Sequence, residues 1–155
     1  MAVITNTILL VRRISDLHRR RDALLERQDR LRRTLPDWTL APLQLVGMTA
    51  EEIRGYMTDL SKAEQDAGLD AIDQELEQID RQVEELENML LTTPARSLES
   101  ITSVLELAVA RFRAQTVSDP EDVFYDYGDA RVLFFLERVS EDLRSILHET
   151  QRNAS

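Results

Sequence analysis

The two histidines are the first residues to consider for metal binding or catalysis. His148 and Glu149 begin like the His-Glu-x-x-His helix of zinc proteases, but the position of the second histidine is occupied by Arg152. His18 is the other histidine, and nothing in the sequence brings the two together. The chain has no cysteine, which excludes disulfides, thiolate metal sites and a cysteine nucleophile. We therefore predict no histidine-based metal site and no catalytic triad.

A cluster of acids around Gly128 invites comparison with a calcium-binding loop. With Gly128 at the sixth loop position, Val123, Tyr125 and Tyr127 occupy the first, third and fifth positions, and Phe134 occupies the twelfth. All four positions require oxygen ligands, so a calcium loop of this type is excluded. We instead expect the acids to stabilise a helix N-terminus through its dipole; they are Asp119, Glu121, Asp122, Asp126 and Asp129.

Eight carboxylates lie between residues 70 and 87, mostly off the apolar positions: Asp70, Asp73, Glu75, Glu77, Asp80, Glu84, Glu85 and Glu87. A catalytic carboxylate pair needs desolvation to separate its two pKa values. We interpret this run as a solvated helix face. The 4 glycines are dispersed and form no phosphate-binding loop. The sequence thus predicts no enzyme, no cofactor and no metal site.

Nine arginines between residues 12 and 33 form the sharpest charge feature: Arg12, Arg13, Arg19, Arg20, Arg21, Arg27, Arg30, Arg32 and Arg33. One hypothesis is a surface for nucleic acid or an anionic membrane, since arginines neutralise phosphates; its candidates are Arg12, Arg13, Arg19, Arg20, Arg27, Arg30 and Arg33. The other hypothesis pairs the arginines with the acids of residues 70–87, in the same chain or in a partner chain. We favour this pairing, because a chain of net charge -10 repels a polyanion.

Apolar residues at alternating steps of four and three predict a basic helix over residues 1–35; the ladder is Leu10, Ile14, Leu17, Arg21, Leu24, Gln28, Leu31 and Leu35. Two of these positions are polar, Arg21 and Gln28. Polar residues at core positions of a coiled coil commonly fix the register or the oligomer state at a cost in stability. Pro36 ends the helix, and residues 36–48 are predicted to be an apolar loop.

A long acidic helix is predicted over residues 49–92. Thr49 and Glu52 have the spacing of a capping box at its start. The apolar ladder before Gly68 is Ile53, Tyr56, Leu60, Ala63 and Ala67. After Gly68 it resumes out of phase, as Leu69, Ile72, Leu76, Ile79, Val83 and Leu86. Either one helix bends there or two helices meet near residues 66–68. We favour one continuous bent helix, since a glycine costs only about 1 kcal/mol in a helix.

Two more helices are predicted towards the C-terminus. Ser97 caps a third helix over residues 97–115. Asp119 and Pro120 predict the start of a last helix over residues 120–150. Phe134 and Phe135 widen its apolar face, so we expect this helix to be the most buried.

The junction between the acidic helix and the third helix has the pattern Thr-Pro-Ala-x-Ser-Leu-Glu, from Thr93 to Glu99. It resembles a junction in small bacterial or phage-borne helical proteins of uncharacterised function, although Ser100 stands where glycine is expected. The resemblance implies a bacterial or phage-borne helical protein and carries no activity.

Together these patterns predict a single all-α domain over residues 1–155: a long antiparallel coiled-coil helical hairpin with two C-terminal helices packed on it as a bundle. The apolar run Ile8 to Val11 is too short to span a bilayer, and its positive charges follow it, so we expect a cytoplasmic protein without a membrane anchor. We expect a structural or adaptor protein that forms a homodimer or other homo-oligomer and binds a protein partner. The candidate seam is Leu10, Ile14, Leu17, Arg21, Leu24, Gln28, Leu31, Leu69, Ile72, Leu76, Ile79, Val83 and Leu86. The alternative is a small nucleic-acid-associated regulator that uses the arginines of residues 12–33.

Overall fold

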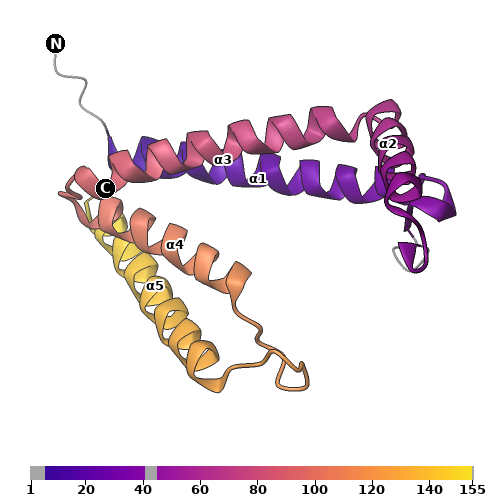
Figure 1. The fold of residues 1–155 in the computed structure, drawn as a ribbon. Coiled ribbons are helices and arrows are strands. Elements are labelled where there is room, and N and C mark those ends of the chain that lie inside the picture. Colours follow the sequence, from indigo (N-terminus) through magenta and orange to yellow (C-terminus); the bar gives the residue numbers. More distant parts are fainter. Residues whose placement is uncertain (1–5, 41–44, 155) are drawn as a thin grey trace, which may run out of the picture. The chain divides into compact units, whose positions relative to one another are not determined.

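The computed structural model describes residues 6–40 and 45–154 of the 155-residue chain. Within these ranges all regular secondary structure is helical, which confirms the predicted all-α class. The elements are α1 (Thr7–Arg32), the 3-10 helix η1 (Asp37–Leu40), α2 (Ala50–Asp66), α3 (Leu69–Thr92), α4 (Leu98–Gln115) and α5 (Tyr127–Asn153) (Figure 1). The predicted helical start at residues 1–5 and the part of the predicted loop at residues 41–44 lie outside the described residues.

These residues form two compact units. One unit comprises residues 16–85, apart from 41–44, and the other comprises residues 6–15 and 86–154. Helices α1 and α3 therefore contribute residues to both units.

In the unit of residues 16–85, α1 and α3 lie side by side and antiparallel (Figure 1). Arg21 of α1 is paired with Asp80, whereas the later Gln28 is paired with the earlier Asp73. The apolar positions of the two helices are buried at this contact; they include Leu24, Leu69, Ile72, Ile79 and Val83. Within this unit α1 and α3 therefore pack as an antiparallel pair, with α2 between them in the chain.

The favoured interpretation of residues 49–92 as one continuous helix is wrong. Gly68 has φ +81°, a left-handed conformation that stops a helix and that glycine adopts without steric cost. The N–H of Ala67 donates to the carbonyl of Ala63, and the N–H of Gly68 donates to that of Gln65, which completes the end of α2. The shift in apolar phase at Gly68 therefore separates two helices with independent faces.

The start of α2 has the predicted capping box. The N–H of Glu52 donates to Thr49 Oγ1 at 3.3 Å, and the N–H of Thr49 donates to Glu52 Oε2 at 2.7 Å. The predicted apolar loop contains η1, which packs on α2: Tyr56 Oη donates to the carbonyl of Trp38 at 2.9 Å. The rings of Trp38 and Tyr56 meet edge to face, with their centroids 5.7 Å apart.

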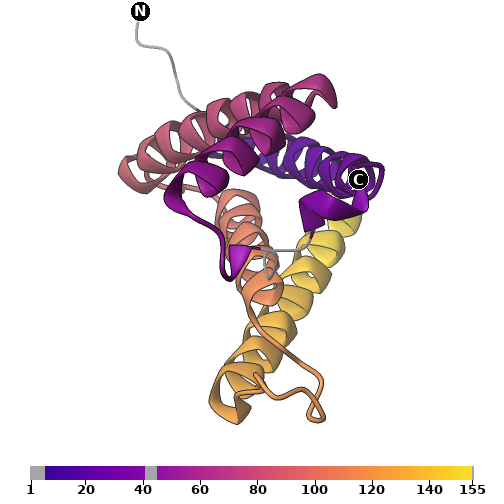
Figure 2. The ribbon, with the colours of Figure 1, turned by 45° about the vertical axis from the view of Figure 1, so that its right-hand side comes forward.

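In the other unit, α4 and α5 form an antiparallel pair (Figure 2). Arg113 near the end of α4 pairs with Glu137, and Glu106 pairs with the later Arg144. The buried residues between the two helices are mostly small or polar, which permits close approach; they are Thr102, Val109, Ala130, Leu133 and Ser140. Ser97 caps α4 by accepting from the N–H of Ser100, as predicted.

The predicted helix start at Asp119 and Pro120 is wrong. Asp119 accepts from the N–H of Glu121 at 3.0 Å, and Asp122 accepts from that of Phe124 at 2.8 Å. These local bonds hold turns instead of a helix. Helix α5 begins at Tyr127 and is capped by Asp126, whose side chain accepts from the N–H of Asp129 at 2.9 Å.

Candidate interaction surfaces

The candidate association seam is covered within the single chain. On α1, Leu10, Ile14, Leu24 and Gln28 are buried; Leu17, Arg21 and Leu31 are half-buried. On α3 the residues Leu69, Ile72, Ile79, Val83 and Leu86 are buried and Leu76 is half-buried. The seam residues therefore serve the packing of this chain.

The two polar seam residues both have partners on α3. Arg21 Nε donates to Asp80 Oδ1 at 2.8 Å. Gln28 donates from its amide to Asp73. Gln28 is only 9% exposed, so this bond satisfies a polar group that burial would otherwise penalise.

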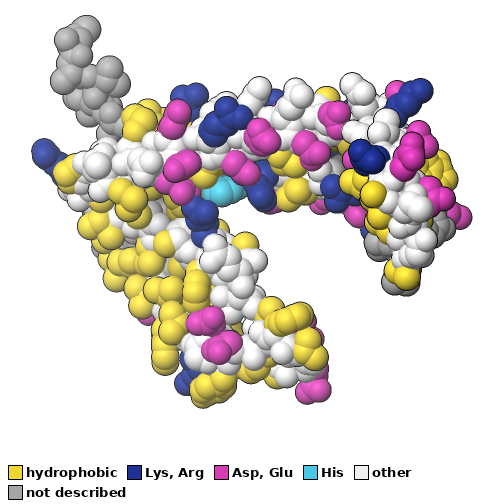
Figure 3. All heavy atoms as spheres, viewed as in Figure 1, with side chains coloured by type: hydrophobic (Ala, Val, Ile, Leu, Met, Phe, Trp, Pro, Cys, Tyr) yellow, Lys and Arg dark blue, Asp and Glu magenta, His cyan; other side chains and the backbone are white. Residues whose placement is uncertain are grey.

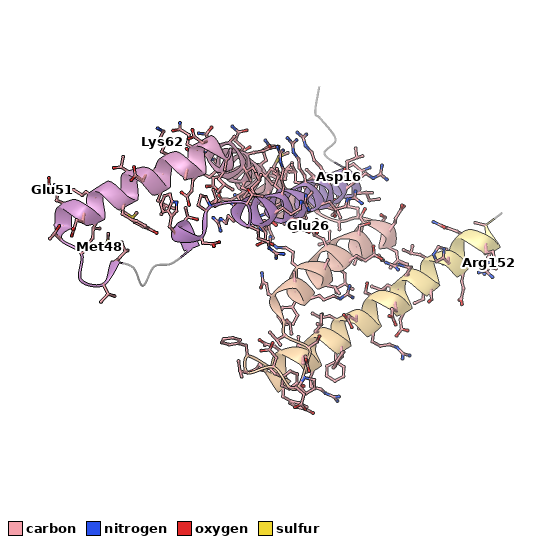
Figure 4. All side chains as sticks on the ribbon, turned by 90° about the vertical axis from the view of Figure 1, so that its right-hand side faces the viewer. Asp16, Glu26, Met48, Glu51, Lys62 and Arg152 are labelled. Carbon is pink, nitrogen blue, oxygen red and sulfur yellow. The ribbon has the colours of Figure 1, made fainter. Side chains whose placement is uncertain are left out.

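The nine arginines of residues 12–33 divide into three groups. Arg20 and Arg21 pair with Glu75 and Asp80 of α3, as the favoured hypothesis predicted. Arg19, Arg30 and Arg33 pair with acids of α1 itself, namely Asp16, Glu26 and Asp29; Asp16 and Glu26 are labelled on α1 in Figure 4. Arg12, Arg13, Arg27 and Arg32 are exposed and form no ion pair with the described residues.

The histidines are placed on α1 and α5. His18 is half-buried, and its Nε2 has no hydrogen-bond partner in the ranges that the structure describes. His148 is exposed. No group of three or more His, Asp or Glu side chains within residues 6–40 and 45–154 is arranged to hold a metal ion. No helix in the same ranges is long and apolar enough to cross a membrane.

The acids of residues 70–87 lie mostly on the exposed side of α3, with Glu75 and Glu87 half-buried. Glu87 is paired with Arg111 of α4. At the start of α2, the backbone N–H of Thr49, followed by the Thr49 side chain, holds the pKa of Glu52 below its usual value. That shift belongs to the capping box of α2.

The expectation that the last helix is the most buried is wrong. Phe134 is 51% exposed and Phe135 is 62% exposed. Exposed apolar residues are spaced along α5 at Val132, Phe135, Val139 and Ile146, with Leu136 and Leu143 half-buried beside them. Helix α4 adds Leu98, Ile101, Leu105, Ala108 and Phe112, which are exposed or half-buried. We call these residues the open face of the α4–α5 pair.

Helix geometry places the two stripes on the same side of the pair. On both helices an open position precedes a buried one by a single residue: Ile101 before Thr102 on α4, and Val132 before Leu133 and Val139 before Ser140 on α5. Two antiparallel helices with the same rotational offset expose the same side. Figure 3 shows hydrophobic side chains gathered over this pair of helices.

Sequence reasoning missed the open face because it assigned all apolar residues of the last helix to one buried side. The width of that stripe was the available signal. A stripe that runs from Leu133 and Leu147 through Val139 to Phe135 is too wide for one neighbouring helix to cover.

The comparisons with known proteins provide no functional assignment. No protein family, curated protein or solved structure matches the chain.

Proposed function

We propose that this chain is a structural or adaptor protein without catalytic activity, and that it works by helix-to-helix contacts through the open face of α4 and α5. The observation that carries the proposal is the exposure of that face. Contiguous exposed apolar surface is unfavourable in water and is typical of protein interaction sites.

The spacing of the open face supports a helical partner. On α4, residues 98, 101, 105, 108 and 112 follow one another at steps of three and four, and on α5 so do residues 132, 136, 139, 143 and 146. Stripes with this spacing accept the side chains of another helix laid along them. We further propose that the protein acts in the cytoplasm, which the lack of cysteine supports.

Site-specific photo-cross-linking in cells of the source organism tests the proposal. Phe135 is replaced by benzoylphenylalanine in one variant of the full chain, and Met57 of α2, which is 51% exposed, is replaced in the control. We expect a cross-linked protein from position 135 and none from position 57. Absence of a product at position 135, or equal products at both positions, would contradict the proposal.

A second candidate function is nucleic-acid binding by α1. The observation in its favour is that Arg12, Arg13, Arg27 and Arg32 lack an acidic partner among the residues described. Phosphate binding by these arginines would weaken steeply with salt, with log affinity falling by roughly 0.9 per phosphate contact for each decade of salt on duplex DNA.

Duplex and single-stranded DNA probes at low salt separate the two functions. Under our proposal the unaltered protein binds neither probe. Salt-sensitive binding that is lost in the triple variant Arg12→Glu, Arg13→Glu and Arg27→Glu, with an unchanged melting temperature, would favour the nucleic-acid function instead.

A further inference from the structure

We infer that the partner of the open face is a second copy of this chain, whose α5 lies antiparallel to the first α5 about a two-fold axis at Val139. The inference rests on the proposed function and names the partner. It is carried by the symmetry of apolar and charged residues along α5.

The apolar residues of α5 are arranged evenly about Val139. Val132 and Ile146 lie seven residues before and after it, and Phe135 and Leu143 lie four residues before and after it. In an antiparallel pair centred on Val139, each of these residues meets its counterpart: Val132 faces the partner's Ile146, and Phe135 faces the partner's Leu143. Val139 faces itself, as a two-fold contact requires.

The charged residues beside the stripe are also arranged symmetrically, but their charge changes sign from one side of the centre to the other. Arg131 and Arg138 precede the centre, whereas Asp142 and Glu149 follow it. Arg131 and Glu149 are each nine residues from position 140, and Arg138 and Asp142 are each two residues from it. In the pair centred on Val139, Arg131 and the partner's Glu149 are two residues out of step, about 3 Å along the helices, and so are Arg138 and the partner's Asp142. This offset is within the reach of the long arginine side chains.

These four charges lie along the edge of the stripe that points away from α4. The guanidinium carbon of Arg131 lies 5.4 Å from the ring centroid of Phe135, which places it beside the open face. Arg138 is bonded to Asp142 within the helix at 3.1 Å, and both side chains are largely exposed and free to bond across an interface as well.

The charge pattern favours the antiparallel arrangement of two α5 helices. A parallel two-fold pair would bring the edge away from α4 against the opposite edge of the partner, so the four charges would have no opposite charge among themselves across the interface. A partner helix of uniformly acidic or basic character would leave half of the edge charges opposed by like charges. A second copy in the antiparallel register satisfies all four positions.

Single-cysteine variants of the full chain test the register, because the natural sequence has no cysteine. Val139→Cys should form a disulfide-linked dimer under mild oxidation, since the two residues meet at the axis. Val132→Cys is the matched control, with 48% exposure compared with 50% for Val139. Its two copies would be 14 residues apart along the helices, about 21 Å, which is beyond the reach of a disulfide. Val132→Cys mixed with Ile146→Cys should give a mixed dimer.

A charge exchange tests the edge residues without altering the apolar stripe. The variant Arg131→Glu with Arg138→Glu carries only acids at the four positions, and the variant Asp142→Arg with Glu149→Arg carries only arginines. We expect each variant alone to be monomeric at a concentration where the unaltered protein has a mass near twice 17.9 kDa by light scattering. An equimolar mixture of the two variants should restore the dimer mass.

Three outcomes would overturn the inference: a monomeric mass for the unaltered protein, no dimer from Val139→Cys, or equal dimers from Val139→Cys and Val132→Cys, which would indicate a parallel pair. The photo-cross-linking experiment distinguishes this failure from that of the proposed function. A product at position 135 of a mass other than twice that of the chain would leave the open face as a binding surface for a different protein. No product there would reject both.

Discussion

Arg21 of α1 donates from Nε to Oδ1 of Asp80 on α3, at 2.8 Å. The pair joins two residues that are 59 positions apart along the chain. It also explains why a charged residue occupies a position where the apolar ladder of α1 predicts leucine.

Reversing the charge of one member of this pair should lower the stability of the protein, and reversing both members should restore it. Arg21→Glu places an acid opposite Asp80, and we expect it to lower the free energy of unfolding by about 1 kcal/mol, since both side chains are partly exposed. Adding Asp80→Arg should restore most of the loss. Urea unfolding measures both. Arg27→Glu, which alters an arginine of α1 without an ion pair to any described residue, should change stability by no more than about 0.5 kcal/mol.

Gly55 inside α2 and Gly68 just after the end of α2 should respond in opposite directions to replacement by alanine. Gly68 has φ +81°, so Gly68→Ala should destabilise the protein by about 1 kcal/mol even though no atom lies within 4 Å of the added Cβ. Gly55 lies inside α2 with the same open space, so Gly55→Ala should stabilise it by about 0.5–1 kcal/mol. Equal effects in thermal unfolding would contradict the assigned helix end.

The capping box of α2 should make stability depend on pH. Thr49 lowers the pKa of Glu52 in the folded state. The contribution of Glu52 to folding stability is therefore present above the pKa that Glu52 has in the unfolded chain, and it is lost as the pH falls through the folded-state pKa of Glu52. Glu52→Ala should therefore be less stable than the unaltered protein at neutral pH, and the two should converge in acid. A difference that is constant with pH would show that the carboxylate charge does not contribute.

Ile14 should be the most sensitive apolar residue of α1. It is 0% exposed, so Ile14→Ala removes a fully buried side chain and should destabilise the protein by about 2–5 kcal/mol. Leu9 on the same helix is 58% exposed, and Leu9→Ala should cost well under 1 kcal/mol. Chemical denaturation of both variants makes the comparison. A similar loss in each would contradict the burial of Ile14.

The sequence by itself determined the features that depend on neighbouring residues. Thr49 and Ser97 start their helices through bonds to residues three positions on, and the periodic apolar ladders establish the all-α class. The sequence also contained a signal for a helix end, namely a glycine at position 68 together with a shift in the apolar phase. The cost of a glycine inside a helix was too small to decide between a bend and a break, and only the backbone conformation of Gly68 did so.

Tertiary structure decided which surfaces are covered. A ladder shows that Leu10, Ile14 and Leu24 need burial, but their neighbours come from distant parts of the chain, and a helix from another chain would satisfy the same pattern. Arg20 and Arg21 form ion pairs with acids on α3, whereas Arg19 pairs with Asp16 on its own helix. Which arginines pair with α3 depends on how α1 is rotated about its axis relative to α3. For the same reason the exposure of Phe135 follows from the width of α4, because one helix covers only one side of α5.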